Sequence, residues 1–240
     1  MVILRIKLDF ACSNLKLPIN YQHLIQGLIY AVFDKDKQGL FLHDIGYKVD
    51  NKTFKMFVFS NLQGKYTIAN NMITFENNMS FSVSSYSDEF IEAIYHFFCT
   101  NSKVILYNQI ITIQQISFYD FPYFKDEQTL LFHSISPVAA YTTEGKQVTY
   151  FNPSSSEFEK LCYKNIEEKN KALQNEISTI SFKIKEVLLE KKRVVTFKNT
   201  FYIAYMTDLK IHGNYETLKL IYDTGLSAKG PAGFGMIELK

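Results

Sequence analysis

The sequence predicts an α+β protein in which two consecutive halves repeat one order of strands and helices. Segments with apolar residues at every second position alternate with segments whose apolar residues recur every three or four positions, the patterns of strands and helices. A polar and aromatic segment, 118–127, separates the halves. The 240 residues, 47% of them hydrophobic, suffice for one large or two small domains. We expect two domains, at residues 1–120 and 128–240.

The first half begins with a predicted strand, because apolar side chains alternate with Arg5, Lys7 and Asp9 over residues 4–10. A helix follows, and Asn20 is its expected N-cap. Its apolar stripe consists of Tyr21, Leu24, Ile25, Leu28, Ile29 and Val32.

The rest of the first half contains two further strand regions and a second helix. Strands broken by turns are expected over 53–84, and the second helix opens at Ser87. Strand-like segments at 104–107 and 110–116 close this half. The resulting β-α-β-β-α-β order is that of the ferredoxin-like unit.

The second half repeats this order without a detectable sequence repeat. Ser156 and Glu159 have the spacing of a capping box, which predicts the start of a long polar helix. The expected elements are a strand at 129–136, a helix at 156–175, strands at 194–205 and 208–212, a helix at 214–223 and a strand at 236–239. The sequence thus predicts two tandem ferredoxin-like domains with a glycine-rich loop before the last strand.

Composition excludes several classes of protein. A net charge of +2 gives no overall field that attracts nucleic acid, so any nucleic-acid site must come from local clusters. Three scattered cysteines favour a reducing compartment and argue against a zinc site. Asp34 and Asp36 begin like a calcium loop, but Ile45 stands where the bidentate acid is needed. We expect a cytoplasmic protein with no metal, no cofactor and no membrane segment.

The C-terminal region contains four of the ten glycines within residues 225–235. Glycine permits positive φ and close approach of a ligand, and Lys229 lies among them, so the loop predicts a phosphate-holding site. A nucleotide-binding P-loop is excluded, because Pro231 follows Gly230 where that motif needs lysine, and no helix follows. A simple flexible turn does not explain Phe234 between two glycines.

This loop and three other segments resemble the CRISPR repeat-processing endoribonucleases, a family within the repeat-associated RNA-binding superfamily. The other segments are Leu17–Tyr30 (LPINYQHLIQGLIY), Phe41–Tyr47 with Phe54–Ser60 (FLHDIGY and FKMFVFS) and, more weakly, 134–138. One departure is Ser227, which stands where the family often has a second glycine. The resemblance implies tandem ferredoxin-like domains and metal-independent cleavage of CRISPR precursor RNA. In that reaction a 2′-hydroxyl attacks the adjacent phosphate, giving 2′,3′-cyclic phosphate and 5′-hydroxyl ends.

The same resemblance implies three catalytic residues. His43 is expected as general base or acid, Lys55 as the cation that stabilises the phosphorane, and Tyr30 as the residue that positions or shares the proton. Lys48 or Lys52 could take the lysine role instead. Each of these residues also has a non-catalytic interpretation. His43 could be a histidine in a surface turn, Tyr30 a tyrosine on a helix surface, and Lys55 a solvated lysine on a strand. The second-choice histidine is His23, whereas His96, His133 and His212 are expected to serve structure.

Two regions are expected to bind RNA. One is the loop, with Gly225, Ser227, Lys229, Gly230, Gly233, Phe234 and Gly235; the other is a basic cluster just before a strand, with Lys191, Lys192 and Arg193 beside Lys183 and Lys185. The alternative for the cluster is a solvated hairpin. The implied partner is CRISPR repeat RNA, and the family resemblance also allows delivery of the product to a CRISPR effector complex and homodimer formation. The rival functions are a non-catalytic RNA-binding subunit of the same superfamily and an unrelated RNA-recognition module.

Overall fold

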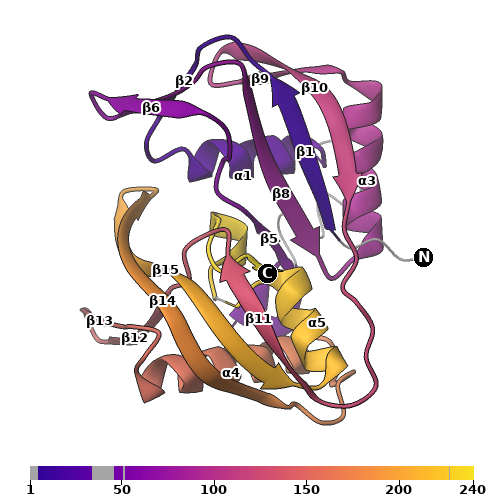
Figure 1. Ribbon diagram of the computed structural model, residues 1–240, viewed down its shortest axis with the longest axis vertical. Helices are drawn as coiled ribbons and strands as arrows, with labels where there is room; N and C mark the ends of the chain where they lie inside the picture. The colour runs from indigo at the N-terminus through magenta and orange to yellow at the C-terminus, as the bar shows by residue number, and fades with distance from the viewer. Residues whose placement is uncertain (1–4, 34–45, 51, 227) are drawn as a thin grey trace.

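The computed structural model describes residues 5–33, 46–50, 52–226 and 228–240. Two antiparallel sheets, one from each half of the chain, pack against helices of their own half (Figure 1). The predicted α+β class is therefore confirmed. None of the described helices is long and apolar enough to cross a membrane.

The first sheet has the strand order β5-β8-β1-β10-β9. Its strands are β1 (Arg5–Ala11), β5 (Phe57–Phe59), β8 (Asn78–Ser85), β9 (Lys103–Leu106) and β10 (Gln109–Phe118), and its helices are α1 (Gln22–Ala31) and α3 (Asp88–Thr100). Without the added edge strand β9, these elements follow the β-α-β-β-α-β order, with the first strand between the third and the fourth. The ferredoxin-like prediction holds for this half.

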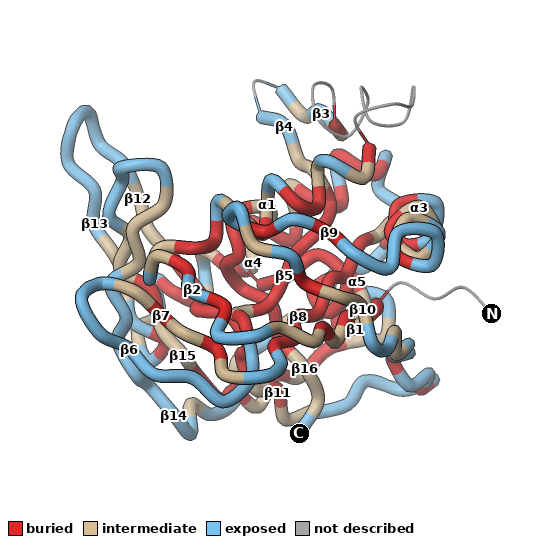
Figure 2. The backbone as a smooth tube through the Cα atoms, turned by 90° about the horizontal axis from the view of Figure 1, so that it is seen from above, coloured by how far each residue is buried: buried red, intermediate tan, exposed pale blue. Residues whose placement is uncertain are grey.

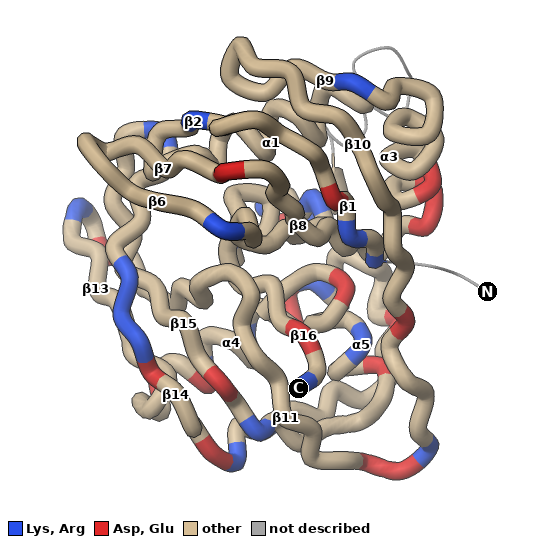
Figure 3. The backbone as a smooth tube through the Cα atoms, turned by 45° about the horizontal axis from the view of Figure 1, so that its top comes forward, with Lys and Arg blue, Asp and Glu red and all other residues tan. Residues whose placement is uncertain are grey.

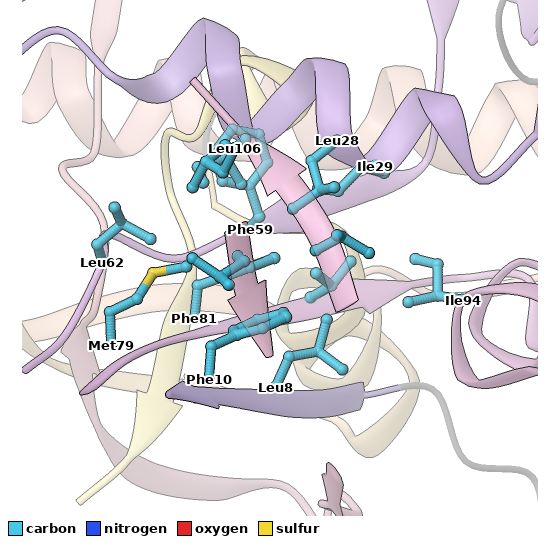
Figure 4. Packing of buried hydrophobic residues seen from close by; sticks show 14 of the residues in the cluster. Leu8, Phe10, Leu28, Ile29, Phe59, Leu62, Met79, Phe81, Ile94 and Leu106 are labelled. Atoms are coloured by element: carbon cyan, nitrogen blue, oxygen red, sulfur yellow. The ribbon is translucent and has the colours of Figure 1, made fainter. Parts of the chain in front are cut away.

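The core of this half lies between the sheet and its two helices. Alternation along β1 puts Leu8 and Phe10 on the helix side, where both are fully buried. Figure 4 shows these side chains beside Phe81 of β8, with Ile29 of α1 and Ile94 of α3 closing the core. The predicted apolar stripe of α1 faces this core, as expected from its helical spacing.

The second sheet repeats the arrangement in the order β14-β15-β11-β16. Its strands are β11 (Gln128–Ser134), β14 (Phe182–Phe197), β15 (Thr200–Gly213) and β16 (Ile237–Leu239), and its helices are α4 (Ser156–Ala172) and α5 (Tyr215–Thr224). The glycine-rich segment, with the short 3-10 helix η2 (Gly230–Ala232), joins α5 to β16. This half is a second ferredoxin-like unit, as predicted.

Smaller elements are added at the periphery. They are the sheet of β2 (Leu15–Pro18), β7 (Met72–Phe75) and β6 (Tyr66–Ala69), the hairpin of β3 (Tyr47–Val49) and β4 (Lys52–Phe54), and the hairpin of β12 (Ala140–Glu144) and β13 (Gln147–Phe151). Figure 2 shows the outer strands β6 and β13 as exposed, around a buried centre.

Three local predictions were wrong. The N-cap of α1 is Tyr21 and not Asn20, because the helical hydrogen bonds begin at the carbonyl of Tyr21, which accepts from the amides of Leu24 and Ile25. The N-cap of α4 is Ser155, one residue before the predicted Ser156.

The third concerns the strand expected at 194–205, because the turn between β14 and β15 lies inside that range and the basic cluster lies within β14 and not before a strand. Pairing of β14 with β15 already begins at Phe182, opposite Gly213.

Glu159, predicted to complete the capping box, instead accepts from the backbone amide of Ile184 at 2.9 Å and pairs with Lys183.

The two halves are joined by buried contacts. Arg5 of β1 is 2% exposed; its guanidinium donates to the carbonyls of Ile237 and Tyr222 and lies 3.3 Å from the centre of the Tyr222 ring. Met56 of the first half belongs to the core of the second half, and the β3–β4 hairpin packs against it through Tyr47. The division into domains at 1–120 and 128–240 stays a prediction, with 119–127 joining β10 to β11.

Candidate functional site

A cavity of about 810 Å³ lies where the two halves meet. Its walls come from β4 and β5 of the first half and from β12, α4 and the glycine-rich segment of the second half. Lys55 and Lys229, predicted site residues from opposite halves, both line it. The fold therefore brings together two predicted segments that are far apart in the sequence.

The glycines allow the loop to close on β5. Gly225, Gly233 and Gly235 have φ of +81°, a conformation that favours glycine. A Cβ on Gly230 would lie 2.6 Å from the carbonyl oxygen of Phe57, and one on Gly233 would lie 2.7 Å from the ring of Phe59. Larger residues at 230 and 233 would push the loop away from the strand that follows Lys55.

The loop is held by its own backbone and by the segment that begins the second half. Leu226 donates to Gly235 at 2.8 Å, and Gly235 donates to Pro137 at 2.9 Å. The amides of Gly225, Ala232, Gly233 and Phe234 likewise donate to protein carbonyls. Backbone amides of these residues are thus engaged within the protein, which leaves the Lys229 ammonium as the cationic group of the loop at the cavity.

Phe234 is fully buried and its ring centre lies 5.4 Å from that of Tyr202. It therefore anchors the loop through packing. RNA contact by the loop residues predicted above stays a prediction, and Ser227 lies outside the described residues.

The predicted catalytic residues lie around β5 as far as the structure describes them. Lys55 immediately precedes Met56, whose φ of +50° and carbonyl bonds to Tyr86 and Ser85 fix the turn between β4 and β5. Tyr30 of α1 is half-buried, its ring centre 5.9 Å from that of Phe57, and burial raises the pKa of its hydroxyl. His43 lies outside the described residues.

The two alternative lysines occupy different surroundings. Lys52 lines the cavity, and its ammonium pairs with Glu168 of α4 at 2.5 Å. Lys48 is exposed on β3 and is not among the residues that line the cavity. The choice of Lys55 stays a prediction.

The four described histidines lie elsewhere. The Nδ1 of His23 contacts the carbonyl of Asn20 at 2.8 Å on the exposed side of α1, and His96 is exposed on α3. His133 pairs with Asp208 and His212 with Glu127 on the second sheet. Among residues the structure describes, no group of three or more His, Cys, Asp or Glu could hold a metal ion.

The floor of the cavity carries two polar residues that the sequence analysis missed. Asn165 and Lys169, one turn apart on α4, are 7% and 4% exposed and line the cavity. The Lys169 ammonium donates to the carbonyls of Thr224 at 3.2 Å and Gly225 at 2.6 Å, and burial lowers its pKa to about 7. Lys169 therefore holds the start of the glycine-rich segment.

The signal for these residues was present in the sequence. Cys162, Asn165 and Lys169 follow one another at spacings of three and four, in line with the buried stripe of Phe158 and Ile166. Polar residues that continue an apolar stripe indicate a polar site on the buried face of the helix. These two were not recognised because most of the other residues of α4 are polar as well.

The basic cluster is separate from the cavity. Lys191, Lys192 and Arg193 are exposed on the middle of β14 and pair in register with residues 204–206 of β15. Figure 3 shows this blue run along the arm that β14 forms at one edge of the second sheet.

Comparison with known proteins gives a consistent set of relatives. The family model for "CRISPR associated protein Cas6, C-terminal" matches residues 119–239. The CRISPR-associated endoribonuclease Cas6 1 of Methanocaldococcus jannaschii is 25% identical over 242 residues, covering 98% of this chain and 92% of the relative. The CRISPR-associated endoribonuclease Cas6 of Pyrococcus furiosus is 22% identical over 94% of this chain and 84% of its own length.

Solved structures share the fold over the whole chain. A structure of a CRISPR associated protein Cas6 has a TM-score of 0.79 at 22% identity, covering 99% of both chains. The product of a Cas6-related gene from Pyrococcus furiosus also gives 0.79, at 17% identity over 99% of this chain and 98% of its own.

Proposed function

Because the chain belongs to the Cas6 family of CRISPR-associated proteins, we propose that it is a metal-independent endoribonuclease that cleaves CRISPR precursor RNA within its repeats. The 2′-hydroxyl beside the cut attacks the phosphorus, the P–O5′ bond breaks, and the products carry 2′,3′-cyclic phosphate and 5′-hydroxyl ends. Both relatives are named as endoribonucleases, and each matches more than nine-tenths of this chain. These matches support an RNA-cleaving enzyme.

The observation that carries the proposal is the charge of the cavity. Of the described residues that line it, only one is acidic, Glu168, whereas five are lysines: Lys52, Lys55, Lys164, Lys169 and Lys229. Lys52 pairs with Glu168 and burial lowers the pKa of Lys169, so the positive charge of the cavity comes mainly from Lys55, Lys164 and Lys229, in a chain whose net charge is only +2. Such a cavity suits a polyanion and a transition state with two negative charges on the non-bridging oxygens of the phosphate.

Each proposed residue has one task. Lys55 is proposed to stabilise the charge that develops on the non-bridging oxygens, since an ammonium at that position acts most strongly in the transition state. His43 is proposed to remove the proton from the 2′-oxygen or to donate one to the leaving 5′-oxygen. Tyr30 is proposed to position or share this proton transfer. Lys229 is proposed to hold a neighbouring phosphate.

Analysis of the product ends tests this function. Purified protein is incubated in excess EDTA with end-labelled repeat RNA from its own locus, and the products are identified by mass spectrometry. We expect a 2′,3′-cyclic phosphate on one product and a 5′-hydroxyl on the other. Tight RNA binding without cleavage would instead establish the non-catalytic RNA-binding subunit.

The arm of β14 is proposed to bind the RNA backbone. Replacing Lys191 and Lys192 by alanine should flatten the slope of log affinity against log salt by about one unit per lost phosphate contact. The control is Lys103→Ala, which removes an exposed lysine of β9 in the other half. Equal slopes for the double variant and the wild type would place the RNA path elsewhere.

The proposal extends to the protein's partners and location. We propose that repeat RNA is its substrate, that a CRISPR effector complex receives the product, and that the protein acts as a homodimer in the cytoplasm. Co-purification and light scattering measure the assembly states directly.

A further inference from the structure

Asn165 differs from the other buried side chains of the cavity. It is 7% exposed, and its Oδ1 has no hydrogen-bond partner within the described part of the chain. Asn170, on the same helix and equally buried, provides the contrast: its amide donates to the carbonyl and accepts from the amide of Ile177, both at 2.9 Å. One buried asparagine of α4 therefore stabilises the fold, whereas the other leaves an acceptor unused.

An unused buried acceptor destabilises the folded protein, because the oxygen loses its bonds to water and gains none. Lys169, one turn along the helix, is not its partner, because the Lys169 ammonium bonds the carbonyls of Thr224 and Gly225. Sites that break such local rules are often functional.

The rest of the cavity offers the other contacts that a nucleotide needs. The rings of Tyr141 and Tyr202 are partly exposed, have centres 6.1 Å apart and line the cavity. The Lys229 Nζ lies 5.9 Å from the centre of the Tyr202 ring. Aromatic faces stack unpaired bases, an ammonium binds phosphate, and an amide reads the polar edge of a base.

We propose that Asn165 recognises one unpaired nucleobase of the bound RNA, with its Oδ1 accepting from an N–H on the edge of that base. Tyr141 and Tyr202 provide the wall beside the base, and Lys229 binds an adjacent phosphate. This inference rests on the proposed function, since it takes RNA as the ligand. It assigns Asn165 to specificity and gives it no part in proton transfer.

The test combines Asn165→Leu with a series of repeat RNAs, each of which lacks one base. For the wild type, removal of the recognised base should weaken RNA binding about tenfold, which corresponds to the loss of one good hydrogen bond. Removal of any other base near the cut should weaken binding less. Asn165→Leu should bind the complete RNA about tenfold more weakly and be insensitive to the loss of that same base. Such non-additivity is the mark of a direct contact.

Thermal unfolding separates this role from a structural one. Asn165→Leu should melt at the same temperature as the wild type or higher, because the unused acceptor is gone. The matched control, Asn170→Leu, should melt lower because it loses both bonds to Ile177, and should keep the wild-type pattern with the RNA series. If the leucine does not fit at 165, Asn165→Ala removes the amide without added bulk and must show the same coupling.

The outcomes distinguish this inference from the proposed function. Wild-type cleavage of repeat RNA without coupling between Asn165 and any base would overturn the inference and leave the endoribonuclease intact. Coupling at one base without cleavage would support the recognition site and overturn the enzyme.

Discussion

Replacing Lys55 by alanine is expected to lower the rate constant for RNA cleavage by about 10²–10³-fold, the range for loss of one group that stabilises transition-state charge. The RNA dissociation constant should change little, because the ammonium acts mainly on charge that develops during the reaction. Lys55 is suited to this role since the turn at Met56 fixes its backbone at the wall of the cavity. Single-turnover cleavage with enzyme in excess measures the rate constant directly.

Lys52→Ala is the matched control for this prediction. Lys52 lines the same cavity, but its ammonium pairs with Glu168, so its removal should affect the attachment of the β3–β4 hairpin to α4 more than the reaction. A large loss of rate in Lys52→Ala with a normal rate in Lys55→Ala would transfer the catalytic role to Lys52.

The second large effect concerns Lys169 and the dependence of stability on pH. The pKa of its ammonium is lowered by burial from 10.5 to about 7, so the unfolded chain binds more protons than the folded one between these values. The free energy of unfolding should therefore rise with pH across this window, by up to about 1.4 kcal/mol per pH unit from this residue. Below about pH 7 both states carry the proton and this contribution is lost.

The measurement is the free energy of unfolding of the wild type and of Lys169→Met, obtained by urea denaturation from about pH 7 to pH 10. The methionine variant should lack the rise, whereas Lys164→Met, which alters an exposed lysine of the same helix, should retain it. If the free energy of unfolding depends on pH in the same way for the wild type and for Lys169→Met, the pKa of Lys169 is not lowered in the folded protein.

The fold was predictable where periodicity and end signals agree. Alternation through Leu8 and Phe10 indicated the central strand β1, and Ser87 does cap α3 by accepting from the amide of Phe90. The start of β14 was missed because it is an edge strand, whose charged side chains remain in water and conceal the strand pattern. Two register shifts between Ile184 and Leu189 further interrupt its alternation.

The site was predictable only in part, because its residues meet through tertiary structure. The sequence selected Lys55 and the loop around Lys229, but no local pattern says that β5 and the loop pack together. That contact depends on Gly230 and Gly233, where a Cβ would collide with β5. Asn165 continues the buried stripe of α4, but this spacing is a weak signal in a polar helix, and the missing hydrogen-bond partner of its Oδ1 is visible only in the structure.

Attack by the 2′-hydroxyl is tested most directly by cleavage of one repeat RNA that carries a single 2′-deoxy nucleotide at the cut, compared with the unmodified RNA, in excess EDTA. If the 2′-oxygen is the nucleophile, the protein cleaves the unmodified RNA and binds the deoxy copy without cleaving it. Cleavage of both RNAs, or cleavage that requires an added metal ion, would contradict the proposed reaction.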